Sequence, residues 1–136
     1  MLYKYHFLMQ ATRVTDGIKI SVDTEYQPLH SNPAQEYYLF SYRVRIENHS
    51  AHTVQLVTRK WYITDSSGES RVVEGEGVVG VQPVIGPGEF YEYDSACNFR
   101  TEMGKMHGYY NMERNDGQRF LVNIPEFRMI VPYKLN

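Results

Sequence analysis

Apolar and polar side chains alternate along most of this chain, and this period-two pattern constrains the fold more than any other feature. Within residues 17–26 every second side chain is apolar, beginning with Ile18 and Ile20. Such alternation is typical of a β-strand with one face in the core and one in water. No segment carries the sustained apolar repeat of about 3.6 residues that marks an amphipathic helix. The pattern therefore predicts an all-β chain.

Two further segments extend the alternation. In residues 37–47 one face is expected to enter the core, and its members are Phe40, Tyr42, Val44 and Ile46. In residues 54–64 strict alternation places Val57, Trp61 and Ile63 on one face and Leu56 with Tyr62 on the other. Trp61 is expected to anchor the core because it lies on a strand beside Ile63.

Turn signals separate the strands at short intervals. Residues 65–68 and 115–117 predict hairpin turns, and residues 86–88 place two glycines around a proline. Pro125 is expected to end a strand that starts near Phe120, with one more short strand after it. About eight short strands spaced in this way predict an antiparallel β-sandwich or barrel.

Length, charge and cysteine content exclude several classes of partner. The 136 residues fit one domain. The 16 acidic and 14 basic residues are interspersed along the chain, which argues against a nucleic-acid partner. No apolar run approaches the roughly 18 residues of a membrane span. With one cysteine, Cys97, and no cleavable leader pattern, we expect a cytoplasmic protein that has no membrane partner.

A glycine motif of the form G-x-G-x-x-G is made of Gly75, Gly77 and Gly80. In dinucleotide-binding folds this motif lies between a strand and a helix. Pro83 and the turn at residues 86–88 leave no room for a helix, so the nucleotide interpretation fails. Two interpretations stay open. The segment is either a glycine-hinged connection between sheets or a loop whose backbone amides bind an anion such as phosphate or pyrophosphate.

Few other residues are arranged for chemistry. His49 and His52 with Glu47 could approach a metal, but such a pair in a hydrophilic turn is typically solvated. Cys97 and His107 are the one available Cys/His pair, and a strand cysteine is typically buried and inert. We therefore expect no catalytic residue, no metal site and no cofactor. His107 and Tyr109, which lie among apolar and aromatic residues, are the candidate partner surface.

Five segments, in order, resemble the ApaG domain family. They are YRVRIENHS at residues 42–50, WYITD at 61–65, VEGEGVVGVQP at 73–83, MHGYY at 106–110 and IPEF at 124–127. Order and spacing match from about Thr12 to Met129. Ala96 and Asn98 depart from the family, which commonly has Gly and Pro around this cysteine. The resemblance implies an N-terminal extension at residues 1–10, an ApaG domain at 11–131 and a C-terminal tail at 132–136.

The resemblance also carries expectations about fold and function. ApaG domains are similar to immunoglobulin and fibronectin type III sandwiches. Bacterial members are small proteins associated with cobalt and magnesium tolerance, and eukaryotic relatives carry the domain in F-box proteins and in a polymerase-delta-interacting protein. The resemblance therefore implies a non-enzymatic protein-binding module, with homodimerisation left open. The alternative is a site for a small ligand or ion: magnesium, cobalt, or phosphate and pyrophosphate at Gly75, Gly77 and Gly80.

Overall fold

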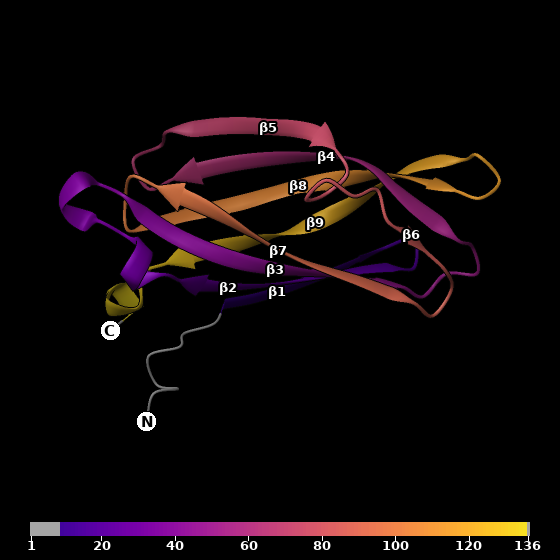
Figure 1. Cartoon of the computed structure of the whole chain (residues 1–136), viewed down its shortest axis with the longest axis horizontal. Helices are drawn as coiled ribbons and strands as arrows, with labels where there is room; N and C mark the ends of the chain where they lie inside the picture. The colour runs from indigo at the N-terminus through magenta and orange to yellow at the C-terminus, as the bar shows by residue number, and fades with distance from the viewer. Residues whose placement is uncertain (1–8, 136) are drawn as a thin grey trace, which may run out of the picture.

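Two antiparallel sheets packed face to face make up the computed structural model, which describes residues 9–135 (Figure 1). The four-stranded sheet has the order β1-β2-β3-β7, with bounds Met9–Thr15, Ile18–Tyr26, Tyr38–Asn48 and Phe90–Phe99. The second sheet has the order β5-β4-β8-β9, with bounds Ser70–Glu76, Val54–Asp65, Met103–Arg114 and Arg119–Ile130. The short β6, Val84–Ile85, pairs with β4. The predicted all-β antiparallel sandwich is confirmed, and its closer likeness to immunoglobulin domains stays a prediction.

The core forms where alternate side chains of the two sheets meet. The predicted core face of β3 is confirmed, since Phe40, Tyr42, Val44 and Ile46 are all buried. On the facing sheet Trp61 is 3% exposed, as expected of a core anchor. Its ring makes edge contacts with Tyr42, Tyr110 and Phe127. The cluster therefore joins one strand of the first sheet to three strands of the second.

A bulge in β4 overturns part of the predicted alternation. The β4–β8 register shifts between Leu56 and Thr58, so one extra residue is inserted at Val57. Because a bulge moves the following side chains to the other face, Leu56 and Trp61 both point into the core, and both are buried. The expectation that Leu56 shares a face with Tyr62 was wrong.

A second bulge overturns the prediction that Pro125 ends a strand. β9 continues from Arg119 to Ile130, and its register with β8 shifts between Met106 and Gly108. Pro125 lies in the extra stretch opposite that shift and is buried. Proline is tolerated there because β9 is a sheet edge and a bulge needs no ladder hydrogen bond from the proline nitrogen.

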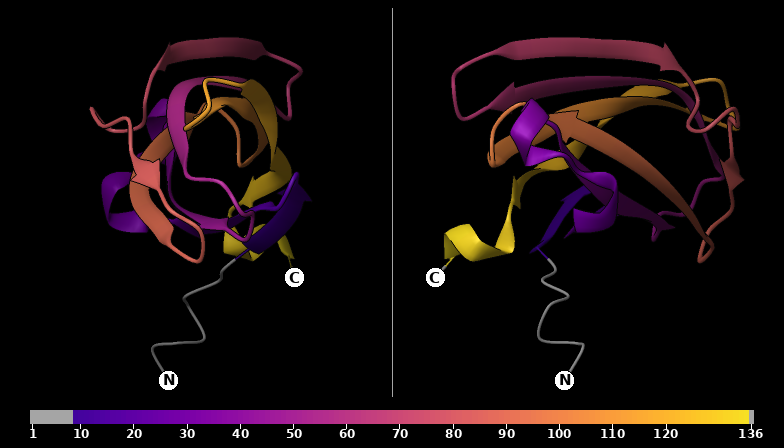
Figure 2. Two further views of the ribbon diagram at one scale, coloured as in Figure 1. Left: turned by 90° about the vertical axis from the view of Figure 1, so that its right-hand side faces the viewer. Right: turned by 60° about the vertical axis from the view of Figure 1, so that its left-hand side comes forward.

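The two sides of the sandwich differ. On one side β1 and β2 lie against β9, and the Asn123 N–H donates to Thr15 Oγ1 at 3.3 Å. On the other side β5 is the outermost strand, and no strand within residues 9–135 lies beyond it (Figures 1 and 2). Arg71 bridges this open side from β5, because its Nη2 donates to the Asn98 carbonyl of β7 at 2.8 Å.

The described residues at the two ends of the domain are few. Of the extension expected at residues 1–10, residues 1–8 lie outside the described part, and Met9 and Gln10 begin β1. The tail contains a 3-10 turn, Pro132–Leu135, in which Lys134 Nζ lies 3.3 Å from Glu102 Oε1. Two further 3-10 turns, Pro28–His30 and Pro33–Gln35, lie between β2 and β3. None of the helical turns in residues 9–135 is long and apolar enough to cross a membrane.

Candidate functional site

The glycine loop, residues 75–80, connects β5 to the segment leading into β6. The Gly77 N–H donates to the Val57 carbonyl at 2.9 Å. Val78 and Val81 exchange two backbone hydrogen bonds, at 2.8 and 3.0 Å, and the Val78 side chain is 1% exposed. These amides already have partners within the chain. An anion at the loop would have to displace those bonds or use the remaining amides.

Arg59 of β4 holds the same loop by its carbonyls. Its Nη1 donates to the Glu76 carbonyl at 3.0 Å and to the Gly77 carbonyl at 2.9 Å. Gly75 is paired with Arg59, and a Cβ at residue 75 would lie 2.7 Å from that nitrogen. The carbonyl oxygens of the loop therefore converge on a cation, which is the opposite polarity to an anion-binding nest.

Strain is concentrated at the tip of the loop. Val79 has φ +47° and Gly80 has φ +76°, and these two residues form the turn between the bridged pair Val78 and Val81. Positive φ at both central residues is typical of a type I′ turn, which favours Asn and Gly. A β-branched residue is costly in that conformation. The side chain of Val79 is nevertheless 65% exposed, so core packing does not explain its presence.

Val79→Asn is therefore expected to stabilise the protein by about 0.5–1 kcal/mol, because asparagine tolerates the left-handed region. Urea unfolding followed by circular dichroism measures the change. Val81→Asn, at a neighbouring exposed valine with no positive φ, is the matched control and should show no gain. Equal or lower stability for Val79→Asn would contradict the assignment of strain.

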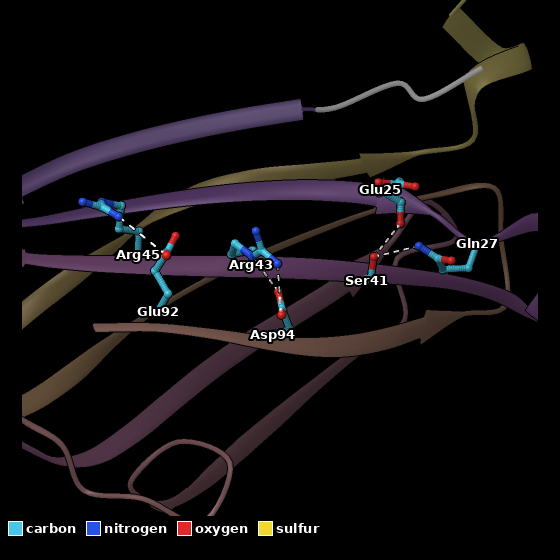
Figure 3. A network of polar contacts seen from close by, with 7 residues as sticks. All are labelled: Glu25, Gln27, Ser41, Arg43, Arg45, Glu92 and Asp94. Carbon is cyan, nitrogen blue, oxygen red and sulfur yellow. Dashed lines mark hydrogen bonds and ion pairs between the residues drawn. The ribbon is translucent and has the colours of Figure 1, made fainter. Parts of the chain in front are cut away.

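The outer face of the four-stranded sheet is polar, and its charged side chains pair with one another (Figure 3). Arg43 Nε donates to Asp94 Oδ1 at 2.9 Å, and this contact raises the pKa of Arg43. Arg45 lies 3.6 Å from Glu92 and its guanidinium covers the Phe90 ring at 3.7 Å. The two arginines drawn there, Arg43 and Arg45, each pair with an acidic residue of β7, so this face offers little unsatisfied surface.

The outer face of the five-stranded sheet is different, and we call its centre the aromatic face: Lys60, Tyr62, His107 and Tyr109. Tyr62 and His107 are cross-strand neighbours whose rings stack with centroids 5.1 Å apart and planes 14° apart. Lys60 Nζ lies 5.4 Å from the Tyr62 ring and 2.9 Å from Glu74 Oε1. The hydrogen bond to Glu74 raises the pKa of Lys60. His107 is exposed and Tyr109 half-buried, so both predicted surface residues face outward.

Exposed apolar side chains surround the aromatic face. Val72 is 55% exposed on β5, and Leu121 is 53% exposed on β9. Beside Leu121 lies a hollow of about 480 Å³, whose lining also includes Lys60, Glu74, Glu76 and Tyr109. Val79, Val81 and Val84 are also exposed, on the glycine loop and β6, whereas Val73 pairs with Trp61 and lies on the inner face of β5. Exposed apolar side chains gathered on one face mark interaction sites.

The remaining candidates from the sequence do not form a site with these residues. Cys97 is 7% exposed on the inner face of β7, and burial raises the pKa of its thiol despite a hydrogen bond from Arg71. His107 lies on the outer face of β8, so the five-stranded sheet separates it from Cys97. His49 Nε2 lies 3.2 Å from Glu47 Oε1. Within residues 9–135 no three His, Cys, Asp or Glu side chains gather closely enough to hold a metal.

Sequence reasoning found half of the aromatic face and missed Lys60 and Tyr62. Their alignment with Tyr109 and His107 depends on the β4–β8 register, which the bulge at Val57 shifts. It also missed the contact of Arg59 with the loop. The one available signal was the charge of Arg59 at a position that alternates with Trp61 and Ile63 toward the core.

The fold and this surface define a class: a two-sheet antiparallel β-sandwich whose β5–β6 loop is held by an arginine of the adjacent strand and whose longer sheet carries an exposed aromatic face. The model of one family, described as the ApaG domain, matches residues 28–114. The chain belongs to the ApaG domain family.

Relatives and a solved structure agree with this assignment. The chain is 47% identical over 126 residues to Protein ApaG of Anaeromyxobacter dehalogenans, covering 93% of this chain and 99% of that protein. It is 45% identical over 119 residues to Protein ApaG of Brucella canis, covering 88% and 92%. The crystal structure of the putative ApaA protein from Bordetella pertussis superposes with a TM-score of 0.83 at 42% identity, covering 85% of this chain and 94% of that chain.

Proposed function

We propose that this protein is a non-enzymatic protein-interaction module whose binding surface is the outer face of the five-stranded sheet. The observation that carries the proposal is the contrast between the two outer faces. One pairs its charges in cross-strand ion pairs. The other presents the stacked Tyr62 and His107 rings beside exposed Val72 and Leu121. Aromatic residues bordered by charged ones are typical of the centre of a protein interface.

The alternative, binding of magnesium or cobalt, or of phosphate or pyrophosphate at Gly75, Gly77 and Gly80, has weaker support. The amides of Gly77 and Val78 are engaged within the chain, and Arg59 is occupied by loop carbonyls. An anion would gain neither without breaking existing bonds, and unmaking a buried hydrogen bond costs about 1–3 kcal/mol. We therefore favour a protein partner, and we place the function in the cytoplasm without a nucleic-acid component.

Site-specific photocrosslinking in cells tests the interaction surface. A photoreactive amino acid is placed at His107 on the aromatic face, and at Arg43 on the polar face as the matched control, since both sites are exposed strand positions. We expect the same discrete adducts from residue 107 in repeated preparations and none of them from residue 43. The proposal fails if both faces give the same adducts, or if residue 107 gives none.

A second substitution links the adducts to side-chain chemistry. Tyr109→Ser removes a half-buried ring from the aromatic face and leaves the photoreactive position intact. Interface aromatics truncated in this way commonly cost more than about 2 kcal/mol of binding, so adduct yield should fall by about ten-fold or more. Unchanged yield would mean that the contact at residue 107 does not involve the aromatic face.

A further inference from the structure

The free edge of the five-stranded sheet is β5, and hydrogen bonds at its two ends fix which of its backbone groups face β4. Beyond its start, the Asp65 N–H donates to the Glu69 carbonyl at 3.0 Å. Beyond its end, the Gly77 N–H donates to the Val57 carbonyl at 2.9 Å. Hydrogen-bonded and non-hydrogen-bonded residue pairs alternate along an antiparallel ladder. The bonds at residues 69 and 77 both mean that the odd-numbered residues of β5 form the hydrogen-bonded pairs with β4. The residues whose backbone groups face β4 are Arg71, Val73 and Gly75.

The same alternation turns the N–H and C=O groups of Ser70, Val72 and Glu74 away from β4. No strand of residues 9–135 lies beyond β5 to receive them. Native sheets usually protect such an edge with lysine, proline, a bulge or a covering segment. Residues 70–76 contain neither lysine nor proline, and the β4–β5 register runs without a shift. The inward-pointing charge of β5, Arg71, is bonded to Cys97 and Asn98, and its outward charges are glutamates. The edge is therefore able to pair with a strand that supplies matching cations.

The charge of this edge selects the chemistry of the added strand. Glu74 and Glu76 lie on the outer face of β5 and are exposed, and Glu69 precedes the strand. The one cation of β5, Arg71, points inward and donates to the Cys97 sulfur and the Asn98 carbonyl. The neighbouring cation of β4, Lys60, forms its ion pair with Glu74. The edge thus presents an acidic border around the exposed apolar Val72.

We propose, on the basis of the interaction function above, that β5 accepts an extended segment of a partner protein as an added antiparallel strand. Directly paired residues lie on the same face of a sheet. In the register in which the segment hydrogen-bonds to the backbone of Val72, it has an apolar residue directly opposite Val72. Because the strands are antiparallel, the residues two and four positions before that apolar residue stand opposite Glu74 and Glu76, and they are lysine or arginine. The recognised pattern is basic-x-basic-x-apolar, added as in other strand-addition complexes.

Two other arrangements fit less well. A second copy of the chain, paired antiparallel through its own β5 around Val72, would place Ser70 opposite Glu74 and Gly68 opposite Glu76, so neither glutamate would meet a cation. The free edge of β7 is the other place for an added strand. Its Asn98 carbonyl is already bonded to Arg71, and Glu92 and Asp94 are paired with arginines of β3.

A fluorescent peptide of sequence KTKTVTT, titrated with the full chain and followed by fluorescence anisotropy, tests the proposal. Val72→Pro is the diagnostic variant. It removes an N–H that points away from β4, so the ladder with β4 keeps its bonds while the edge loses a donor and gains a ring. We expect binding to weaken by about ten-fold or more. Glu74→Gln with Glu76→Gln should weaken binding by about five-fold at low salt, and less at high salt.

Amide hydrogen exchange and a charge-reversed peptide complete the test. Peptide binding should slow exchange at Val72 and Glu74 and leave the already bonded Val73 unchanged. The peptide ETETVTT should bind about five-fold more weakly than KTKTVTT at low salt. The proposal is overturned if Val72→Pro binds as tightly as the parent, if both peptides bind equally, or if neither peptide binds. It is also overturned if sedimentation shows self-association that Val72→Pro abolishes, which would make a second copy the occupant. If photocrosslinking from residue 107 persists in any of these cases, the protein-interaction function is retained and only the strand-addition proposal is overturned.

Discussion

Replacing Trp61 with alanine is expected to lower the free energy of unfolding by about 3–5 kcal/mol, one of the two largest effects that we expect of a single substitution in this chain. The indole is 3% exposed and lies at edge contact distance from three rings, with centroids 5.8 Å away for Tyr42 and Phe127 and 6.4 Å away for Tyr110. Aromatic pairs of this geometry add about 0.5–1.5 kcal/mol beyond area burial. Truncation would also leave a cavity between the sheets.

Urea unfolding followed by far-ultraviolet circular dichroism measures this loss, since Trp61 is the single tryptophan and its fluorescence disappears with it. Val72→Ala is the control: Val72 is 55% exposed, and such surface changes stay within about 0.5 kcal/mol. Because total stability is commonly about 5–15 kcal/mol, Trp61→Ala could fail to fold. Trp61→Phe then supplies an intermediate loss. A loss below about 1 kcal/mol for Trp61→Ala would contradict the role of Trp61 as core anchor.

The sequence predicts the strands of this fold well because their alternation is regular and their turns carry strong local signals. The hairpins at residues 65–68 and 115–117 are present, with positive φ at Gly68 and Gly117 as their turns need. Both failures are bulges. At Val57 the extra residue is one more apolar side chain in an apolar run, so nothing local marks it. At Pro125 the signal was present, but it also fits the end of a strand.

The candidate surface was less predictable than the core. Burial alternates along one strand, and His107 and Tyr109 lie at the outward positions of β8. Neighbours on that face come from other strands, and their identity depends on register. One shifted residue in β4 decides that Tyr62, and not an adjacent residue, stacks on His107. The backbone phase that exposes Val72 at the free edge likewise follows from pairing with β4, which a single strand does not encode.

Gly77→Ala is the second substitution expected to have a large effect, and it separates the two interpretations of the glycine motif. Residue 77 has φ +62°, and a Cβ there would overlap the carbonyl oxygen of Val81. The left-handed conformation costs alanine about 1–2 kcal/mol. Overpacking against fixed backbone adds about 1–3 kcal/mol. The total expected loss of unfolding free energy is therefore about 2–5 kcal/mol.

Gly80→Ala is the matched control, because residue 80 has φ +76° and nothing lies within 4 Å of the position of its Cβ. It should lose only the conformational cost of about 1–2 kcal/mol. The difference between the two variants, measured by urea unfolding, isolates the contact of residue 77 with Val81. If the loop connects the sheets and binds no anion, 10 mM pyrophosphate should stabilise the parent protein no more than it stabilises Gly77→Ala. An anion site would instead stabilise the parent selectively, since ligand binding to the folded state adds to stability. Equal losses of unfolding free energy for Gly77→Ala and Gly80→Ala would show that the Val81 contact does not constrain residue 77.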